Sequence, residues 1–329
     1  MKGWNMQLAK RILWSVPVAI ALAAAGASCA QENFPAKPMR LVLPGPPGNV
    51  TDLMARALSK SAGDQLGQPV VVENRPGGAT IIATEQVARS RPDGYTILMV
   101  SAPYVTNPGL YDKLPYDTLR DLDPLIQVSE NGFLIGVNSA QPYKSLRELI
   151  DASRRAEGGI SYASPGIGTV MHLTGQLLNI ELGTRFNNVA YRGSAQAVQD
   201  VAAGHVPMII DPIATNLAMI KQGRIRALAV THSARQPELP DVPTVRELGF
   251  PRLEVKSFSG FMLPAGTPRP VVARLNSAYN NAIRDPDIRR QLAGQNLMGG
   301  SPEDFGVVLK AELDRWVPLI RKLGIKPEG

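Results

Sequence analysis

Three short loops rich in glycine, proline and serine stand just before predicted helices and could bind an anion. They cover residues 44–52, 164–169 and 191–194. The first backbone N–H groups of a helix have no acceptor within the helix and lie at the positive end of its dipole, where a carboxylate or phosphate is stabilised. The loops therefore predict an anion site built largely from main-chain donors.

The first loop offers the clearest cradle for a carboxylate. Gly48 would let a ligand approach the backbone closely, and Asn49, Val50 and Thr51 would supply amides or side-chain donors. In the alternative interpretation this is an ordinary turn in which Asn49 or Thr51 only caps the helix. Asp52 would repel an anion, so we expect it to cap the helix where it borders the site.

The second loop repeats the pattern in the second half of the chain, so that two helix N-termini could face one anion. Gly166 and Gly168 would give the backbone its freedom. Ser164 and Thr169 are candidate hydroxyl donors to the carboxylate or to waters that bridge it. A plain N-cap role for Thr169 is the alternative.

The third loop, Tyr191-Arg192-Gly193-Ser194, adds a third helix start and a cation. Arg192 could form a bidentate pair with a second carboxylate, or could be a solvated surface charge. Asp211 ends a predicted strand. Its carboxylate could accept from a hydroxyl or ammonium group of the ligand, or could simply orient loop amides.

Three further residues are expected to line the cleft and to tune what lies beyond the first carboxylate. Ser101 and Tyr104 follow the predicted strand 95–100, and Tyr104 would offer an apolar or stacking surface. Phe258 lies in an extended stretch and is similarly placed. The alternative for Phe258 is an ordinary core position.

Other chemistries fit the sequence less well. Met171 stands where a dinucleotide-binding fingerprint has its third glycine. A hydrolase could assemble Ser164, His172 and Asp211, but Pro165 removes the amide that would follow the nucleophile in an oxyanion hole. The three histidines lack metal-ligand spacing, and a single cysteine excludes a disulfide framework. We expect no metal and no cofactor.

The first thirty residues have the pattern of an export signal. Basic residues precede an apolar run over 12–25, and small residues precede a cut before Gln31. The run is short for a membrane-spanning helix. A retained N-terminal anchor and lipidation of Cys29 are the alternatives, and in each case the product leaves the cytoplasm.

The composition is that of a globular protein with two domains. The chain has 329 residues, of which 44% are hydrophobic and 19% charged. Removal of residues 1–30 leaves 32 basic and 28 acidic side chains, a net charge of +4. The basic residues form no block, so nucleic acid is not expected as a partner, whereas an anionic ligand is compatible.

Short β-branched strands alternate with turns and amphipathic helices, which is typical of parallel α/β domains. Strands are predicted over 40–43, 70–72, 95–100, 160–163, 188–191 and 206–210, and helices over 51–66, 84–89, 170–177, 194–203 and 214–221. Each half therefore predicts a doubly wound domain. Extended stretches over 126–137 and 253–263 would cross between the two lobes, and the segment beyond 263 would return to the first lobe, as in a hinged cleft binder.

The motifs together resemble the substrate-binding receptors of tripartite tricarboxylate transporters, the Bug family of periplasmic proteins. The matching segments are 44–48 with 51–52, 66–77, 92–96, 113–117, 162–168 with 172–173, 191–194, 239–244 and 263–268. Gly45 and Asn49 depart from the Pro-Phe-Pro-Pro-Gly-Gly loop of the family, where relatives have Phe and Gly. Arg192 and Phe258 stand where relatives often have Lys and Trp.

The resemblance implies a two-lobed periplasmic-binding-protein fold of type II, a Venus flytrap, in which two crossing strands join two doubly wound domains. One domain would comprise residues 31–128 and 255–329, and the other residues 129–254. It further implies a periplasmic, non-enzymatic receptor that captures a small mono-, di- or tricarboxylate and delivers it to membrane permease subunits. A monomer is the expected state, because the receptor must open, close and dock. Alternatives are an orphan receptor of this fold that signals to a membrane sensor, and an exported serine hydrolase.

Overall fold

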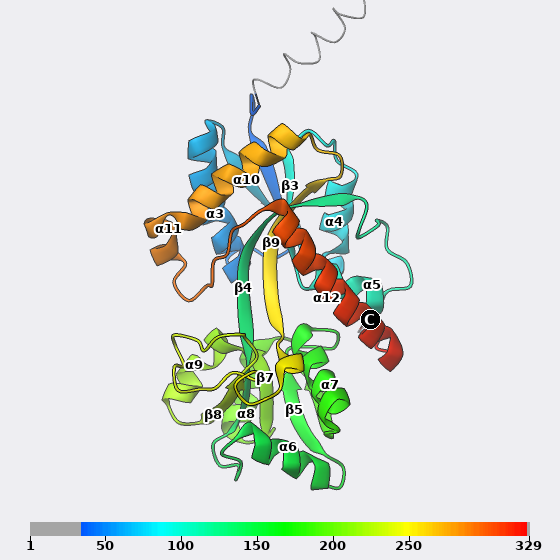
Figure 1. The fold of residues 1–329 in the computed structure, drawn as a ribbon, viewed down its shortest axis with the longest axis vertical. Helices are drawn as coiled ribbons and strands as arrows, with labels where there is room; N and C mark the ends of the chain where they lie inside the picture. The colour runs from blue at the N-terminus through cyan, green and yellow to red at the C-terminus, as the bar shows by residue number, and fades with distance from the viewer. Residues whose placement is uncertain (1–33, 328–329) are drawn as a thin grey trace, which may run out of the picture.

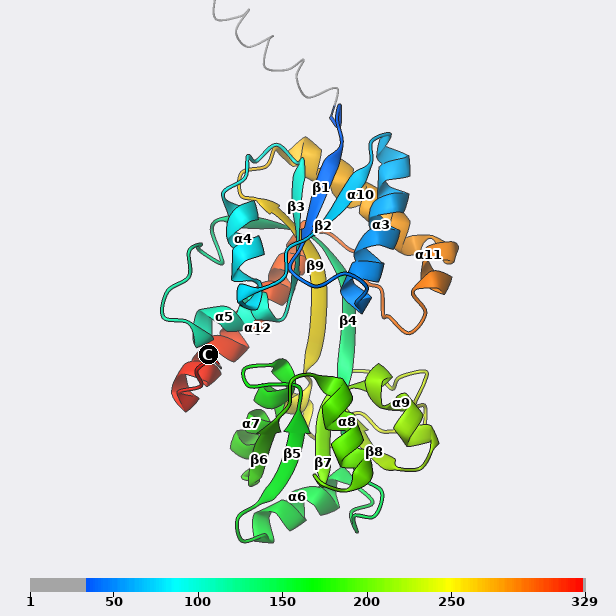
Figure 2. The same ribbon diagram turned by 180° about the vertical axis from the view of Figure 1, so that it is seen from behind.

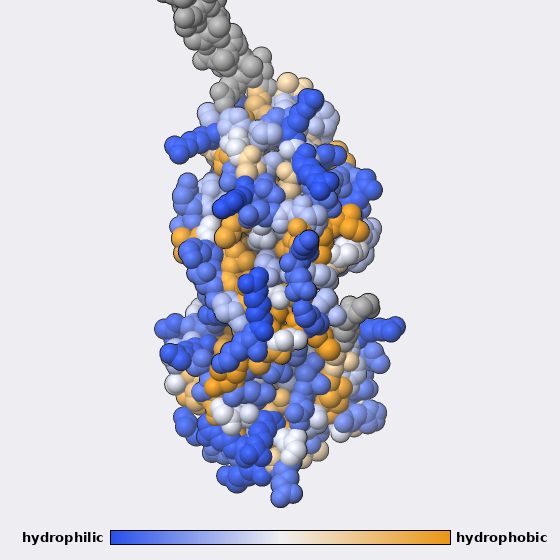
Figure 3. Space-filling view, turned by 90° about the vertical axis from the view of Figure 1, so that its right-hand side faces the viewer, coloured by the Kyte–Doolittle hydropathy of each residue, from blue (hydrophilic) through white to orange (hydrophobic). Residues whose placement is uncertain are grey.

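The protein consists of two lobes stacked along its long axis and joined by a narrow waist (Figure 1). The computed structural model describes residues 34–327, so the predicted export signal and Cys29 lie outside the described residues. No helix within residues 34–327 is both long and apolar enough to span a bilayer. Polar residues cover most of both lobes, while hydrophobic residues reach the surface at and near the waist (Figure 3).

The upper lobe, which we call lobe 1, is built on a mixed sheet with a parallel half. Strand β1 (Met39–Leu43) pairs in parallel with β2 (Val70–Asn74) on one side and with β3 (Thr96–Ser101) on the other. Strand β9 (Lys256–Pro264) adds to β3 in the antiparallel sense, and β4 (Leu122–Asn138) adds to β9. The edge of this sheet is β2, and its other side continues into the second lobe through β4.

Helices cover both faces of the lobe 1 sheet. One face carries α3 (Val50–Leu66), α10 (Arg269–Arg284) and α11 (Pro286–Gln291), whose apolar side chains meet Leu41, Ile97 and Phe261 of the sheet in one buried cluster. The other face carries η1 (Gly78–Thr80), α4 (Ile81–Ala88), α5 (Pro103–Leu110) and α12 (Pro302–Leu323). Helix α12 begins with a Ser301–Asp304 capping box and ends at Gly324 in the left-handed conformation.

The lower lobe, lobe 2, has its own sheet around the second half of β4. Strands β5 (Ile160–Ser164), β6 (Phe186–Ala190) and β7 (Met208–Pro212) are mutually parallel in the order β7-β5-β6, and β4 pairs antiparallel with β7 and β8 (Ile225–Val230). Its helices are α6 (Leu146–Arg155), α7 (Val170–Leu182), α8 (Ser194–Ala203) and α9 (Ile213–Lys221), followed by the short η2 (Pro251–Leu253). Strand β8 was not among the predicted strands.

Two strands cross the waist side by side, and glycines let other elements approach them closely. The pairing of β4 with β9 runs from Leu122↔Pro264 to Gly132↔Lys256 and passes through both lobes. A Cβ at Gly260 would lie 2.2 Å from the Phe305 ring of α12, and a Cβ at Gly132 would lie 2.8 Å from the backbone nitrogen of His232. The crossing strands therefore pack closely against helix α12 in lobe 1 and against the backbone at His232 in lobe 2.

The close approach at Gly260 makes a prediction about stability. Gly260→Ala would push a methyl group into the Phe305 ring and to 2.9 Å from the Ile126 carbonyl oxygen, so it should lower the free energy of unfolding by about 1–3 kcal/mol. Gly306→Ala is the control, because its Cβ would meet only Pro124 Cγ at 3.5 Å, on helix α12. That change should stabilise the protein by about 0.5–1 kcal/mol. Urea unfolding measures both, and equal stability of the two variants would contradict the packing argument.

Candidate functional site

The carboxyl ends of the parallel strands in the two lobes face each other across the waist. Loops after β1, β2 and β3 reach down from lobe 1, and the loops after β5, β6 and β7 reach up from lobe 2 (Figure 2). Ligands of α/β proteins bind outside the carboxyl ends of such strands. All three predicted anion loops lie at this junction, and those before α3 and α8 lie on the side of the waist away from α12.

The first loop presents main-chain donors, not side-chain donors. Asn49 is the N-cap of α3, and its side-chain oxygen accepts from the Asp52 amide at 2.8 Å and from the Thr51 hydroxyl at 2.7 Å. Among residues 34–327, no acceptor lies within hydrogen-bond reach of the amides of Asn49, Val50 and Thr51. The N-cap interpretation of Asn49 is confirmed, and the same cap leaves these three amides for a ligand.

The Asp52 carboxylate holds the first loop in place through hydrogen bonds. It is 2% exposed and accepts from the Gly48 amide at 3.0 Å, from Arg56 Nε at 2.9 Å and from Asn74 Nδ2 at 2.9 Å. These hydrogen bonds, Arg56 first, lower its pKa to about 2 although burial opposes the shift. The expectation that Asp52 caps α3 is wrong, because Asn49 does so. Asp52 fixes the direction of the Gly48 amide, which points to Asp52 and so is not available to a ligand.

A second lobe 1 loop was missed by the sequence predictions. After β2 the chain passes through Gly77 and Gly78 and then places Ala79 and Thr80 at φ values of 48° and 73°. A β-branched residue in the left-handed region is strained, by roughly 1–3 kcal/mol, and such strain concentrates at binding sites. Asn107 Nδ2 holds the loop by donating to the Ala79 carbonyl oxygen at 2.8 Å. The Gly-Gly pair before a helix was the sequence signal that could have identified it.

In the second predicted loop, at the start of α7, the side-chain hydroxyl groups form hydrogen bonds within lobe 2. Ser164 is fully buried and donates to Asn188 Oδ1 at 2.7 Å. Thr169 donates to the Gly166 carbonyl oxygen at 2.7 Å and caps α7. In this structure both hydroxyl groups are used within the lobe, so their donation to a ligand stays a prediction, whereas the N-cap alternative for Thr169 is confirmed. Amides at the start of α7 remain as the donors of this loop.

The third loop combines an exposed cation with a buried carboxylate. Arg192 is exposed and forms no ion pair within residues 34–327. Asp211 is fully buried and accepts from Ser194 Oγ at 2.6 Å, from Asn216 Nδ2 at 2.8 Å and from the Thr215 hydroxyl. Burial raises the pKa of Asp211. Asp211 thus orients neighbouring side chains and not the loop amides, and its predicted contact with the ligand is not tested here. Gly193, at φ 116°, is the N-cap of α8.

Aromatic residues expected in the cleft wall belong to the core instead. Tyr104 is 2% exposed and donates its hydroxyl to the Thr118 carbonyl oxygen at 2.6 Å. Phe258 is 5% exposed and packs edge-on against Phe305, with 5.9 Å between ring centroids. The predictions for these two residues are wrong, because each ring is needed to fill space beside α5 or α12. Ser101 stays half-buried at the end of β3, and Tyr191 donates its hydroxyl to Asp200 at 2.8 Å.

The side chains that a serine hydrolase would need do not contact one another at this junction. The hydroxyl of Ser164 bonds to Asn188, and His172 Nδ1 accepts from the Gly168 amide at 3.1 Å, so neither contacts the other. Burial lowers the pKa of His172, which keeps the imidazole neutral. In the part of the chain that the structure describes, no group of three or more His, Cys, Asp or Glu side chains could hold a metal ion.

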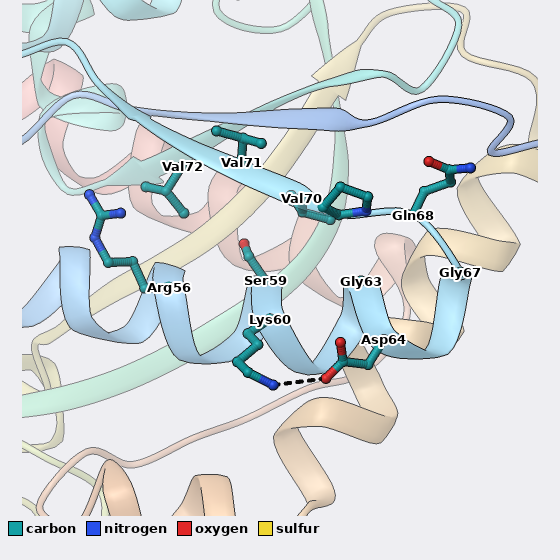
Figure 4. A pocket seen from close by; sticks show the side chains of 11 residues that line it. Arg56, Ser59, Lys60, Gly63, Asp64, Gly67, Gln68, Val70, Val71 and Val72 are labelled. Atoms are coloured by element: carbon teal, nitrogen blue, oxygen red, sulfur yellow. Dashed lines mark hydrogen bonds and ion pairs between the residues drawn. The ribbon is translucent and has the colours of Figure 1, made fainter.

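A surface hollow lies elsewhere, away from the junction of the lobes. It has a volume of about 760 Å³ between α3 and the edge strand β2, lined by Arg56, Ser59, Lys60 and Val71 among others (Figure 4). Lys60 and Asp64 pair with each other there at 3.0 Å. None of the predicted ligand-binding residues lines it. We therefore place the candidate site at the junction of the lobes, where helix N-termini converge.

The buried Asp52 makes stability depend on pH. Because its pKa is lowered on folding, the ionised group stabilises the native state above the unfolded pKa of about 4, and this contribution is lost as pH falls from about 4 toward 2. Solvent screens the half-exposed Arg56, so we expect Asp52→Asn to cost about 1 kcal/mol at pH 7 and less at pH 3. Urea unfolding at both pH values tests this. Asp64→Asn, whose side chain is 70% exposed on the same helix, is the control and should cost little at either pH.

Comparisons with known proteins agree with this geometry. The profile of the tripartite tricarboxylate transporter family receptor matches residues 54–325. Protein BugT of Bordetella pertussis is 33% identical over 96% of this chain and 98% of its own. Two solved structures from Rhodopseudomonas palustris are similar: Rpa4515 with adipate (31% identity, 90% of this chain and 100% of that one, TM-score 0.74) and MatC with bound malate (29%, 87% and 100%, 0.70). The chain therefore belongs to the tripartite tricarboxylate transporter receptor family, whose members are solute-binding receptors and not enzymes.

Proposed function

We propose that this protein captures a small carboxylate between its lobes, with backbone amides at helix N-termini as the main donors. The observation that carries the proposal is the set of amides at Asn49, Val50 and Thr51, which have no acceptor within the described chain. They belong to a loop at the junction with lobe 2 (Figure 2). Anions bind at such positions because several N–H groups and the helix dipole converge there. The adipate and malate held by two similar proteins support a carboxylate as the ligand class.

Both of those ligands carry two carboxylate groups, so a second anion contact is needed for a ligand of this kind. Arg192 is our candidate, because it is exposed beside the third loop and forms no ion pair in the described residues. A guanidinium offers two parallel donors to one carboxylate. Gly166 and Gly168 shape the opposing loop at φ values of 147° and 76°, and Ser101, half-buried at the end of β3, is a further polar group.

Capture would proceed by closure of the lobes around the ligand. Residues 31–128 with 255–329 would move as one body and residues 129–254 as the other, bending at the paired strands β4 and β9. Only the closed form satisfies the donors of both lobes, so the ligand shifts the equilibrium toward it. Gly168 and Leu110 already touch across the junction, since a Cβ at Gly168 would lie 3.0 Å from Leu110 Cδ1.

The proposed location is the periplasm, after removal of residues 1–30, and the proposed partner is the membrane permease of a tripartite tricarboxylate transporter. The basis is membership of a transporter receptor family and the N-terminal pattern of the sequence. A receptor that reports to a membrane sensor would use the same carboxylate site. Reconstituted uptake with the permease, in the presence and absence of this protein, separates the two roles.

A thermal-shift screen of residues 31–329 tests the ligand class. The panel contains mono-, di- and tricarboxylates, uncharged amide analogues of each, and inorganic phosphate. A ligand that binds only the native state raises the melting temperature. At a concentration a hundredfold above Kd it adds about 2.7 kcal/mol to the free energy of unfolding. We expect shifts with carboxylates alone. No shift with any carboxylate, on folded protein shown to be ligand-free, would refute the proposal.

A matched pair of glycine variants tests the first loop. Gly48 and Gly67 lie at the two ends of α3, at φ values of 81° and 73°, and a Cβ at either would meet nothing within 4 Å. Leucine at each position carries a similar backbone strain, but only Gly48→Leu obstructs the approach to the free amides. We expect isothermal titration to give at least a tenfold weaker affinity for Gly48→Leu and an unchanged affinity for Gly67→Leu. Equal affinities would remove the first loop from the site.

A further inference from the structure

Helix α12 lies on one side of the waist, and the candidate-site loops before α3 and α8 lie on the other. The ribbon views show α12 and η2 in front of the crossing strands from one side, and the loops before α3 and α8 in front from the other (Figures 1 and 2). Strands β4 and β9 pass between the two sides and are the covalent links between the lobes. A rotation that closes the site side must therefore widen the α12 side.

A hydrogen bond spans the waist on the α12 side. Arg315, on the lobe 1 helix α12, donates from Nη1 to the Glu254 carbonyl oxygen at 2.7 Å. Glu254 follows η2 and precedes β9, at the lobe 2 end of the crossing strand. The Glu254 carboxylate is in turn held by Arg246 Nε at 3.0 Å. The link thus joins lobe 1 to a segment that is itself braced within lobe 2.

Packing keeps the Arg315 side chain in place. Its guanidinium lies 5.8 Å from the centre of the Trp316 ring and 3.8 Å from Glu312, whose carboxylate accepts from Trp316 Nε1 at 2.7 Å. Trp316 is fully buried in an apolar cluster that also contains Leu253 of η2. Two neighbours on the same helix therefore hold the guanidinium toward the Glu254 carbonyl group.

We propose that Arg315 is a strap that favours the open arrangement of the lobes and so sets the affinity for the ligand. The proposal rests on the closure argued above. The Arg315–Glu254 hydrogen bond is made with the lobes as they stand and lengthens when the α12 side widens. Each closure must break it, so the strap lowers the population of the closed, binding-competent form, and the apparent affinity falls by the same factor.

The same helix offers a matched control. Arg321 donates from Nη2 to the Pro108 carbonyl oxygen at 3.0 Å, but Pro108 is on α5, so this bond lies within lobe 1. Arg315→Met and Arg321→Met remove the same group from the same helix and leave a side chain of similar length. Only the first should change the relation between the lobes.

The experiment measures the distance between the lobes without ligand. Spin labels are attached to cysteines introduced at the exposed Lys60 of α3 and Gln199 of α8 in residues 31–329, which contain no native cysteine. Pulsed electron paramagnetic resonance then reports the open and closed populations. We expect Arg315→Met to enlarge the short-distance population about fivefold and to tighten binding of any carboxylate found in the screen by a similar factor. Arg321→Met should change neither.

Distances unchanged by Arg315→Met, or shifted equally by Arg321→Met, would overturn the proposal. If Arg315→Met does not fold, as judged by circular dichroism, Arg315→Gln is measured in its place with the same expectation. Absence of carboxylate binding in the wild type would refute the proposed function only, because the ligand-free distances still decide whether Arg315 restrains the lobes.

Discussion

The pairing of β4 with β9 is the constraint on which the rest of this structure depends. The two strands run antiparallel from Leu122↔Pro264 to Gly132↔Lys256, and beyond that point β4 continues into the sheet of lobe 2. A buried hydrogen bond between Ser129 and Ser259, 2.7 Å long, joins them at the waist. Because both links are paired to each other, the lobes can bend about the waist but cannot slide past one another. That restriction keeps the strand ends of the two lobes opposed.

Because the strand ends face each other, the conformation of each loop is determined chiefly by hydrogen bonds of its own side chains. The hydroxyl groups that the sequence offered to a ligand hold the backbone in this structure: Thr169 caps α7 and Ser164 bonds to the neighbouring strand. The Asp52 carboxylate likewise fixes the Gly48 amide. The donors left over are main-chain amides. A site of the proposed kind would recognise one carboxylate by geometry and would leave discrimination among acids to the groups around it, with Arg192 as our candidate cation.

Local patterns predicted the elements well, and long-range contacts account for the errors. The strand predicted over 160–163 and the helix over 194–203 match β5 and α8, because periodicity and turn residues are local signals. The role of Tyr104 was wrong because it depends on the Thr118 carbonyl group, which no pattern places next to it. The turn at Gly77 and Gly78 had a local signal that was overlooked, but its strain at Ala79 depends on a long-range contact, since Asn107 holds it from another helix. Ser164 was expected to donate its hydroxyl group to a ligand, but in this structure it donates to Asn188, on the adjacent strand.

The buried Asp52, which holds the first loop, also explains why Arg56 follows it one helical turn later in α3. A buried carboxylate directly beneath an anion site would repel the ligand across a few ångströms of poorly screened space. Arg56 lies 2.9 Å from Asp52 and forms a neutral pair with it, so the loop keeps its rigid anchor without a net charge. In the proposed site, the first loop would then attract the ligand through the positive end of α3, an interaction of modest strength. An attraction of that size is comparable to a single hydrogen bond, so in our proposal a contact as distant as that between Arg315 and Glu254 would influence how tightly the lobes close.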